Sequence, residues 1–213
     1  MKILVACEYS GRVRDAFTAR GHYAMSCDIL DTETEGPHYQ GDVRDVLSKD
    51  WDMIIAFPPC TKLSCIGAAH WKRWAADGSQ QDAIDFFMMF ANAKCERVAV
   101  ENPAGIISTR WRKPDQYINP FQFGEPWRKR TGLWLKGLPL LVPTNIVEPQ
   151  GYWVDGGTYS RPSSPNYSKA STKAEGAFMQ VRSPAEKRKG SDRAKDRSLT
   201  FQGIANAMAE QWG

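Results

Sequence analysis

The order of apolar and polar stretches along the chain predicts strands and helices that alternate. Four short apolar runs predict buried strands, over residues 2–6, 22–29, 52–57 and 97–102. Residues 11–21 and 79–95 space their apolar side chains as amphipathic helices do. Strands that alternate with helices favour βαβ units. We therefore predict an α/β fold with a mostly parallel sheet flanked by helices.

The pattern changes in the last third of the chain. Residues 131–141 predict a strand and a turn, and residues 198–213 predict a short closing helix. Residues 152–176 are rich in Ser, Gly, Pro and Tyr without periodicity, which is typical of a long loop or an insertion. A chain of 213 residues suits one domain. We expect a single catalytic domain over residues 1–213, with residues 142–197 as a basic insertion.

The net charge of +4 is unevenly distributed along the sequence. Residues 161–197 hold ten Lys and Arg against four Asp and Glu, a local charge of +6 that leaves −2 for the rest of the chain. A basic segment on a nearly neutral body suggests a polyanionic partner, with nucleic acid first among them. The alternative is a solvated face without a partner, which composition alone favours equally.

The cysteines and histidines do not form a metal-binding pattern. The five cysteines are odd in number and include no CxxC pair, which disfavours a disulfide framework and a structural zinc site. The three histidines are not at metal-ligand spacing, so we predict no metal. No apolar run approaches the roughly 20 residues of a membrane span, and the N-terminus turns acidic too early for a secretory signal. We expect a cytoplasmic protein without a membrane partner.

Polar and reactive side chains follow the predicted strands at the point where each strand ends. Ligands of an open α/β sheet bind beyond the carboxyl ends of its strands. The segments at those ends are Glu8–Gly11, Asp28, Pro58–Cys60 and Glu101–Pro103. Packing alone does not explain so many polar groups at one edge, so we predict a functional site there.

Cys60 is the candidate nucleophile of that site. Pro58 and Pro59 each fix φ and remove a backbone donor, so the turn is stiff and the thiol is placed before a substrate arrives. Lys62, and the N-terminus of a following helix if one forms, would favour the thiolate. The alternative is a small buried packing residue, the usual place of a free cysteine. The Pro-Pro-Cys sequence at a strand end favours the nucleophile.

Three carboxylates have candidate roles. Burial at the end of an apolar strand would raise the pKa of Glu101 and suit a general acid; the alternative is a salt bridge or a cap on a helix starting near Pro103. Asp28 and Asp42 suit a nucleoside cofactor, through its ribose hydroxyls and its adenine amino group, or else they cap turns. The first turn has one glycine, Gly11, and lacks the G-x-G-x-x-G pattern. A cofactor without phosphates fits better, and S-adenosylmethionine is one.

These motifs, in this order, resemble those of the DNA cytosine-C5 methyltransferase family over most of the chain. VACEYSGRVRDAF resembles the first, cofactor-binding motif, CDI and GDV the second and third, PPC the nucleophile motif, and VENP the ENV motif. PWRKRT (126–131) is similar to the arginine motif, and GIANAMAEQW (203–212) to the terminal helix motif. The chain departs from the family in lacking F-x-G-x-G-G, in having Pro103 for valine, which a helix start would tolerate, and in having Ala205 for glycine.

The resemblance implies a Rossmann-like fold that uses S-adenosylmethionine, and a covalent mechanism. Cys60 would add to C6 of cytosine and activate C5 for the methyl group, Glu101 would hold or protonate N3, and Arg128 or Arg130 would brace the base. A cytosine in duplex DNA would first flip out of the stack. The resemblance assigns substrate binding to Pro59, Ser64 and Asn102. It assigns cofactor binding to Cys7, Glu8, Tyr9, Ser10, Gly11, Asp28, Ile29, Asp42, Val43, Pro58 and Asn206.

The interval that holds a target-recognition domain in this family is short here. In one hypothesis residues 142–197 are a reduced DNA-binding element of low specificity, whose aromatic side chains stack on bases, namely Tyr152, Trp153, Tyr159 and Tyr167. In a second, the substrate is a free cytidine nucleotide or single-stranded DNA. A third is a non-catalytic nucleic-acid-binding module, against which the intact Cys60 and Glu101 argue. The small motif set would suit a phage or mobile-element gene.

Overall fold

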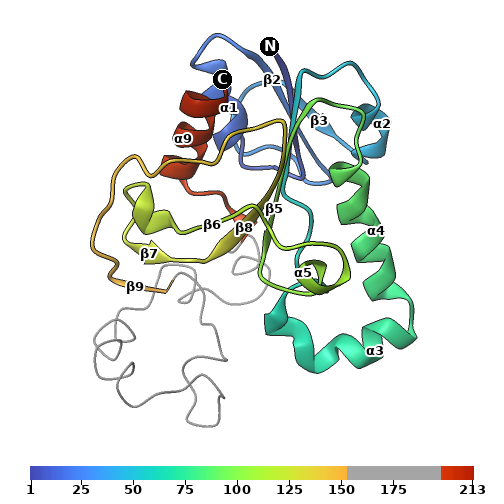
Figure 1. Cartoon of the computed structure of the whole chain (residues 1–213). Coiled ribbons are helices and arrows are strands. Elements are labelled where there is room, and N and C mark those ends of the chain that lie inside the picture. Colours follow the sequence, from blue (N-terminus) through green and yellow to red (C-terminus); the bar gives the residue numbers. More distant parts are fainter. Residues whose placement is uncertain (153–197) are drawn as a thin grey trace.

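A computed structural model describes residues 1–152 and 198–213, which are arranged around one seven-stranded sheet (Figure 1). The order of its strands is β3-β2-β1-β4-β5-β8-β6, and only β8 runs antiparallel to its two neighbours. The strands are β1 (Lys2–Ala6), β2 (Tyr23–Asp28), β3 (His38–Gln40), β4 (Met53–Ala56), β5 (Arg97–Pro103), β6 (Gln116–Ile118) and β8 (Thr131–Lys136). A separate parallel pair joins β7 (Trp127–Arg128) to β9 (Gly151–Tyr152).

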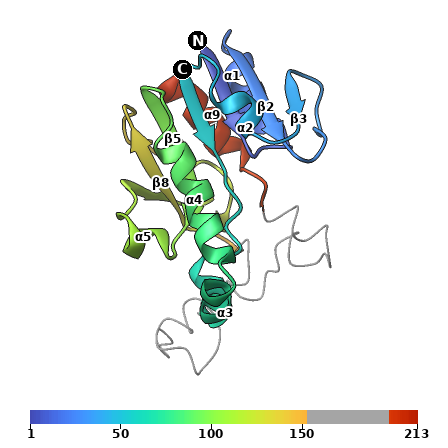
Figure 2. The ribbon, with the colours of Figure 1, turned by 90° about the vertical axis from the view of Figure 1, so that its right-hand side faces the viewer.

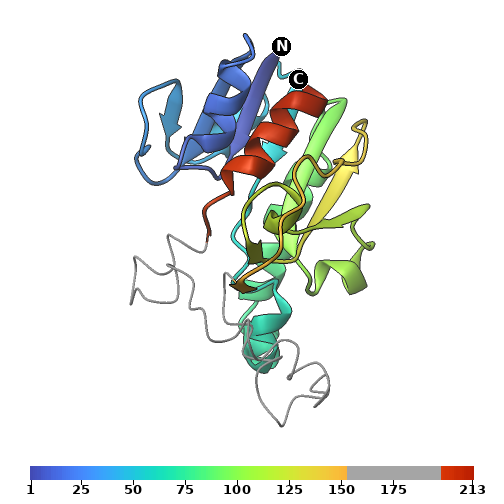
Figure 3. The ribbon, with the colours of Figure 1, turned by 90° about the vertical axis from the view of Figure 1, so that its left-hand side faces the viewer.

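Helices cover both faces of the sheet. They are α1 (Arg12–Thr18), α2 (Arg44–Leu47), α3 (Trp71–Ala76), α4 (Ser79–Ala91), α5 (Ile107–Arg110) and α9 (Gln202–Trp212), with the 3₁₀ helices η1 (Cys65–His70) and η2 (Pro120–Gln122). Figure 3 shows α1 and α9 side by side on one face, and Figure 2 shows α4 on the other. The predicted α/β class, the mostly parallel sheet and its helical layers are confirmed.

Burial on both faces explains why the strand sequences are continuous apolar runs. All four residues of β4 are buried, as are the last four of β1. On one face Val13 and Phe17 of α1 and Met208 of α9 pack against these strands. On the other, Phe87 and Phe90 of α4 do so. Parallel strands covered on both sides lose the alternation of apolar and polar residues that half-buried strands show.

The chain order places a topological switch point between β1 and β4. The first five strands follow the order 3-2-1-4-5 of a Rossmann-like sheet. After β1 the chain moves outward to β2 and β3, and it then returns to the other side of β1 to form β4. Ligands of such sheets bind outside the carboxyl ends of the strands at this point. The predicted site segments after β1, β4 and β5 therefore lie at the expected edge.

Arg14 of α1 is a fully buried charge that the sequence did not identify. Its guanidinium donates hydrogen bonds to the loop after β2, to β2 itself and to its chain neighbour, and the accepting residues are Asp15, Ser26, Thr32, Thr34 and Glu35. A buried charge is tolerated when it is paired and its donors are satisfied. Arg14 therefore fixes residues 31–36 against α1.

Replacing Arg14 by Met is expected to lower the free energy of unfolding by about 3–5 kcal/mol, because the buried Ser26 and four accepting residues nearer the surface lose their donor. Arg20→Met is the matched control. Arg20 is half-exposed and forms a long ion pair of 3.9 Å with Glu210, so its replacement should lower the free energy of unfolding by at most about 1 kcal/mol. Urea unfolding of both variants measures the difference. Equal losses in the two variants would contradict the assigned role of Arg14.

Candidate active site

Cys60 lies on an exposed turn four residues beyond β4. The Cys60 carbonyl accepts hydrogen bonds from the backbone N–H groups of Leu63 (3.0 Å) and Ser64 (2.8 Å), which close the turn. Pro58 is buried, whereas Pro59 and Cys60 are exposed. The exposed side chain contradicts the alternative of a buried packing cysteine. No helix follows Cys60 directly, because η1 begins only at Cys65.

The segment after β5 holds this turn in place. Asn102 is buried, and its Nδ2 donates a hydrogen bond of 2.9 Å to the Pro58 carbonyl. The Ile106 N–H donates to the Leu63 carbonyl at 2.8 Å. Gly105 lies so close that a Cβ there would overlap the same carbonyl oxygen. Asn102, predicted to bind substrate, therefore positions the backbone of the turn that carries Cys60.

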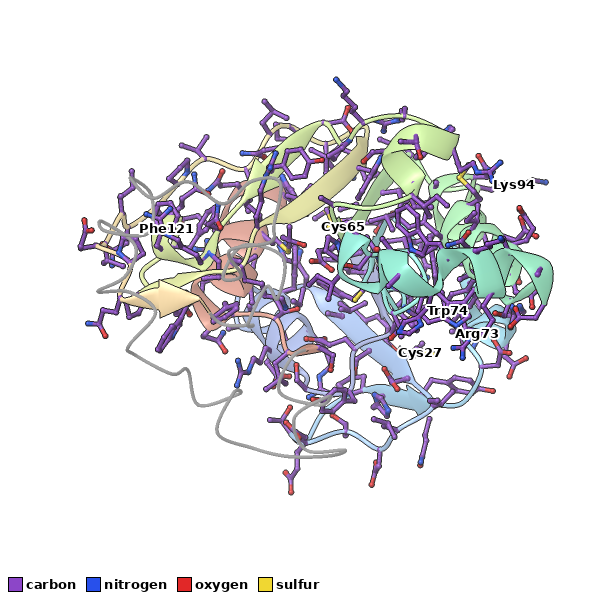
Figure 4. The ribbon with its side chains drawn as sticks, turned by 90° about the horizontal axis from the view of Figure 1, so that it is seen from below. Cys27, Cys65, Arg73, Trp74, Lys94 and Phe121 are labelled. Atoms are coloured by element: carbon purple, nitrogen blue, oxygen red, sulfur yellow. The ribbon has the colours of Figure 1, made fainter. Side chains whose placement is uncertain are left out.

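Ser64 has a structural position at the end of the turn. It is buried, its backbone pairs with Gly105 in an isolated bridge, and its Oγ accepts a hydrogen bond from the Ile66 N–H at the start of η1. In Figure 4, which views the carboxyl edge from below, the neighbouring Cys65 lies near the centre of the molecule. The role of Ser64 in substrate binding stays a prediction.

A third element, helix α4, contacts the turn through Gln80. This side chain is 3% exposed, and its Nε2 donates to the Lys62 carbonyl at 3.1 Å. A buried amide whose donor is used in this way costs free energy when it is removed. The turn that carries Cys60 is therefore held from β5 and from α4.

Gln80→Leu should speed hydrogen exchange of the Leu63 and Ser64 amides about tenfold, because losing one buried hydrogen bond costs roughly 1–1.5 kcal/mol. The adjacent Gln81 is the control: it is exposed and bonds only Asp85 on its own helix. Gln81→Leu should leave both rates unchanged. Identical exchange in the two variants would show that Gln80 does not hold the turn.

Glu101 lies near the carboxyl end of β5, beside the strand that leads to Cys60. Burial of its carboxyl group raises its pKa, and the positive charge of Lys129 offsets this only in part. The Thr131 hydroxyl donates a hydrogen bond to Glu101 Oε1. The predicted helix start at Pro103 is wrong, because β5 continues through Pro103, which lies opposite Thr131 of β8. Glu101 therefore caps no helix.

A cavity adjoins Glu101 at this edge of the sheet. Its lining is mostly apolar and comes from the central part of the sheet and the loops beside it, from the segment before α9 and from α9 itself: Phe57, Glu101, Ile118, Pro120, Lys129, Thr131, Ser198, Leu199, Thr200, Phe201, Ile204 and Met208. The cation in this lining is Lys129. Arg128 and Arg130 lie elsewhere, with their guanidinium groups over the rings of Phe121 and Tyr117. The structure thus brings Glu101 together with Lys129 rather than with either predicted arginine.

The first turn uses Glu8 to close the N-terminus of α1. Glu8 is buried, and its carboxylate accepts hydrogen bonds from the N–H of Val13 (2.7 Å) and Arg14 (3.3 Å) and from the Ser10 hydroxyl. Gly11 has a φ of 74°, where a side chain would be strained. Because the Glu8 carboxyl group already accepts hydrogen bonds from these N–H groups, they are not available to a phosphate.

A second cavity lies over this first turn. Its lining consists of Cys7, Glu8, Tyr9, Ser10, Phe57, Ser198, Leu199 and Thr200. Burial raises the pKa of the Cys7 thiol, and the charges of Asp28 and Asp42 raise it further, so both carboxylates lie near this turn. The two cavities share Phe57 and residues 198–200, which the sequence analysis did not identify.

The remaining predicted cofactor residues surround the ends of β2 and β3. Asp28 accepts a hydrogen bond from the Leu30 N–H, and Ile29 is 76% exposed. Asp42 accepts from the N–H and the guanidinium of Arg44, and these hydrogen bonds lower its pKa. Val43 is buried. The turn-capping alternative for both aspartates is thus observed, and it leaves part of each carboxylate's bonding capacity for a ligand.

Asn206 lies apart from both cavities. It is on the exposed side of α9, and its Oδ1 accepts a hydrogen bond from Gln202. Ile204 and Met208 of the same helix face the cavity beside Glu101. The contact of Asn206 with a cofactor stays a prediction.

The described residues contain no cluster of three His, Cys, Asp or Glu side chains that could hold a metal ion. None of the helices in residues 1–152 and 198–213 is long and apolar enough to cross a membrane. Residues 153–197, which include most of the predicted basic insertion and Trp153, Tyr159 and Tyr167, lie outside the described part of the chain.

Comparisons with known proteins give remote structural similarity only. No family model and no curated protein matches the sequence. The Entamoeba histolytica methyltransferase EhMeth aligns with a TM-score of 0.45 and 11% identity, over 79% of this chain and 62% of that one. Dnmt2 from S. pombe aligns with a TM-score of 0.40 and 12% identity, over 66% and 50%. A DNMT2 variant from Spodoptera frugiperda aligns with a TM-score of 0.40 and 12% identity, over 69% and 54%. The chain thus spans less than two thirds of each of these chains.

Proposed function

We propose that this chain is an S-adenosylmethionine-dependent methyltransferase that modifies C5 of cytosine in DNA through a covalent bond between Cys60 and C6 of the base. The supporting observation is the placement of an exposed thiol, on a turn held by hydrogen bonds, and a partly buried carboxyl group with a raised pKa at the ends of two adjacent strands, β4 and β5. Such a pair suits nucleophilic addition assisted by an acid.

Cys60 and Glu101 have complementary roles in the proposed reaction. C5 of cytosine is a weak nucleophile until a thiolate adds to C6. The Cys60 sulfur forms a bond to C6, the electrons of the C5–C6 double bond shift into the ring, and the proton of Glu101 neutralises the charge that develops at N3. After C5 has gained the methyl group, a base removes the C5 proton, and the electron pair left behind expels Cys60. Covalent catalysis thereby divides one difficult step into easier ones.

The residues of the second cavity fit the proposed cofactor. S-adenosylmethionine supplies a methyl group on a positively charged sulfur. The carboxyl group of Glu8 occupies the N–H donors at the N-terminus of α1, which disfavours a phosphate there and suits a cofactor without one. Asp28 and Asp42, near Cys7, would accept hydrogen bonds from a nucleoside. Both cavities include Phe57, so a methyl donor and an acceptor would bind side by side.

The charge of residues 161–197, and the place of the residues that follow them, support DNA as the substrate. Residues 161–197 carry a charge of +6. The chain enters this part of the sequence from β9, which pairs with Arg128, and the next described residues, 198–200, line the cavity beside Glu101. The basic sequence is therefore joined at its C-terminal end to residues that line this cavity. Polyanion binding by such a segment falls steeply with salt.

Transfer of tritium from labelled S-adenosylmethionine tests the proposal on duplex DNA, single-stranded DNA and deoxycytidine nucleotides. Label on C5 of cytosine in DNA, with binding that weakens steeply as salt rises, is the expected result. Transfer to nucleotides alone would replace DNA with a small substrate. DNA affinity without transfer to any cytosine substrate would support the binding-module hypothesis instead.

A further inference from the structure

The sequence Trp127–Thr131 distributes its side chains to two sides of the chain. The guanidinium of Arg128 lies 5.5 Å from the ring centre of Phe121, and that of Arg130 lies 3.8 Å from the ring centre of Tyr117. Phe121 lies at the far side of the carboxyl edge from α3 (Figure 4). Lys129, between the two arginines, lines the cavity with Glu101. Alternation along the chain therefore sends the lysine, and not the arginines, to the acid.

Lys129 and Glu101 form the charged part of an otherwise apolar and hydroxyl-lined cavity. Glu101 accepts a hydrogen bond from Thr131, two residues after Lys129. Lys129 also supplies the charge that opposes the desolvation of Glu101. No other side chain in the cavity lining within residues 1–152 and 198–213 is ionisable. The ionisation of Glu101 in this region is therefore coupled to one cation.

The hydrogen-bonding edge of cytosine matches this pair. O2 and N3 are adjacent acceptors, so recognition of both needs two donors side by side. A protonated Glu101 donates to N3, and its second oxygen can accept from the 4-amino group. O2 then needs a donor next to Glu101, and an ammonium is the donor present in the cavity lining. When a thiolate adds to C6, negative charge spreads to N3 and O2, where a fixed positive charge is most stabilising.

We propose that Lys129 is the residue that binds the ring carbonyl of the substrate base and stabilises the charge developed there, in place of Arg128 or Arg130. The proposal rests on the proposed function for the identity of the base. Lysine is a compact point charge, whereas arginine offers a planar fork. A single ammonium suits one carbonyl oxygen in a small cavity, and the two arginines are instead stacked on aromatic rings.

A purely structural role for Lys129 is the competing explanation. Its Nζ donates a hydrogen bond of 3.5 Å to the Leu199 carbonyl and lies 5.8 Å from the ring centre of Phe201. Both contacts would hold the segment before α9 at the cavity. An ammonium has three N–H donors, so a bond to Leu199 and one to a base are compatible. Lys129→Gln separates the roles, because an amide can still donate to Leu199 but carries no charge.

Two measurements on the full chain test the proposal. The first is the pKa of Glu101, measured by ¹³C NMR of protein with labelled glutamate. The signal of Glu101 is assigned by its absence from the spectrum of Glu101→Gln. The second is exchange of tritium from C5 of cytosine in DNA into water without methyl donor, which reports addition of Cys60 alone. The variants are Lys129→Met, Lys129→Gln and Lys129→Arg, with Lys136→Met as the control lysine at the other end of β8, where its Nζ bonds Ala93.

Lys129→Met and Lys129→Gln should raise the pKa of Glu101 and slow tritium exchange about 100-fold. The fall in rate at high pH, where Glu101 loses its proton, should move to higher pH in both. Lys129→Arg should retain the pKa and most of the rate, and Lys136→Met should change neither. In Arg130→Met the pKa of Glu101 should equal that of the wild type.

If Lys129→Gln behaves like the wild type in both measurements, Lys129 only holds the segment before α9, and the proposal is overturned. A raised Glu101 pKa in Lys129→Gln, with no exchange on cytosine by the wild type, would have a different meaning. That result would confirm the pairing of Lys129 with Glu101 while rejecting cytosine as the base, and with it the proposed function.

Discussion

Cys60→Ala is expected to abolish transfer of a methyl group to cytosine, with a loss of about 10⁴-fold or more in kcat, because no other group replaces the covalent step. The Cys60 side chain is exposed on a turn whose backbone is fixed by contacts with Asn102 and Gln80, so removal of the sulfur leaves the fold intact. Unfolding in urea should be unchanged within about 0.5 kcal/mol. Filter binding of tritiated DNA and the unfolding curve together measure the two effects.

Cys65→Ala is the matched control for that experiment. Cys65 is the other exposed cysteine in the described residues, and it lies five positions further along the chain, at the start of η1. Its backbone N–H bonds the Ala104 carbonyl, a contact that alanine preserves. Full activity in Cys65→Ala with none in Cys60→Ala assigns the nucleophile. Activity in both variants would exclude a covalent role for either thiol.

Glu101→Gln should lower kcat by about 100- to 1000-fold, because the amide cannot transfer a proton to the base. Burial raises the pKa of Glu101, so the wild-type rate should fall as pH rises through that raised pKa, when the acid becomes ionised. The residual rate of Glu101→Gln should lack this fall. A pH profile with the same high-pH fall in the variant would assign it to another group.

The raised pKa of Glu101 also predicts that Glu101→Gln, which lowers activity, stabilises the folded state at high pH. A carboxyl group whose pKa is raised by folding favours the folded state below its unfolded pKa, and this contribution is lost as pH rises through the folded pKa. Above its raised pKa the wild type therefore holds a poorly solvated charge in the region of Lys129. Glu101→Gln removes that charge, and its Tm should depend less on pH above 4.5 than that of the wild type, as thermal unfolding over a pH series would measure.

Most of the sheet could be predicted because its strands are buried on both faces. The apolar runs at 2–6, 52–57 and 97–102 became β1, β4 and β5 within one or two residues. The short strands β3 and β6 were missed, since three residues with mixed burial give no apolar run. Their places in the sheet depend on hydrogen bonds with β2 and β8, which no local pattern reveals.

The candidate site could be predicted where a residue follows directly after a strand. Cys60 and Glu101 both lie at the sheet edge expected from the order of strands. The helix expected at Pro103 was wrong because the antiparallel strand β8, a distant part of the sequence, extends β5 through that proline. Proline starts helices, but it is also found where a strand ends.

The positioning residues could not be predicted because their contacts are distant in sequence. Gln80 and Gln81 are indistinguishable as neighbours in a helix, and only the packing of α4 against the turn buries one of them. Lys129 stands between two arginines in WRKR, and composition gives no reason to prefer it. Thr131 bonds Glu101, and Lys129, two residues earlier, lines the same cavity, which only the folded chain reveals.

Trapping of a covalent complex tests the central claim most directly. DNA that contains 5-fluorocytosine carries fluorine in place of the C5 proton, so elimination stops and the sulfur–carbon bond to C6 persists. In the presence of S-adenosylmethionine we predict one adduct, which mass spectrometry locates on the peptide containing Cys60, with the base and an added methyl group. Adduct on another cysteine, or none while the chain binds both DNA and S-adenosylmethionine, would contradict the proposed mechanism.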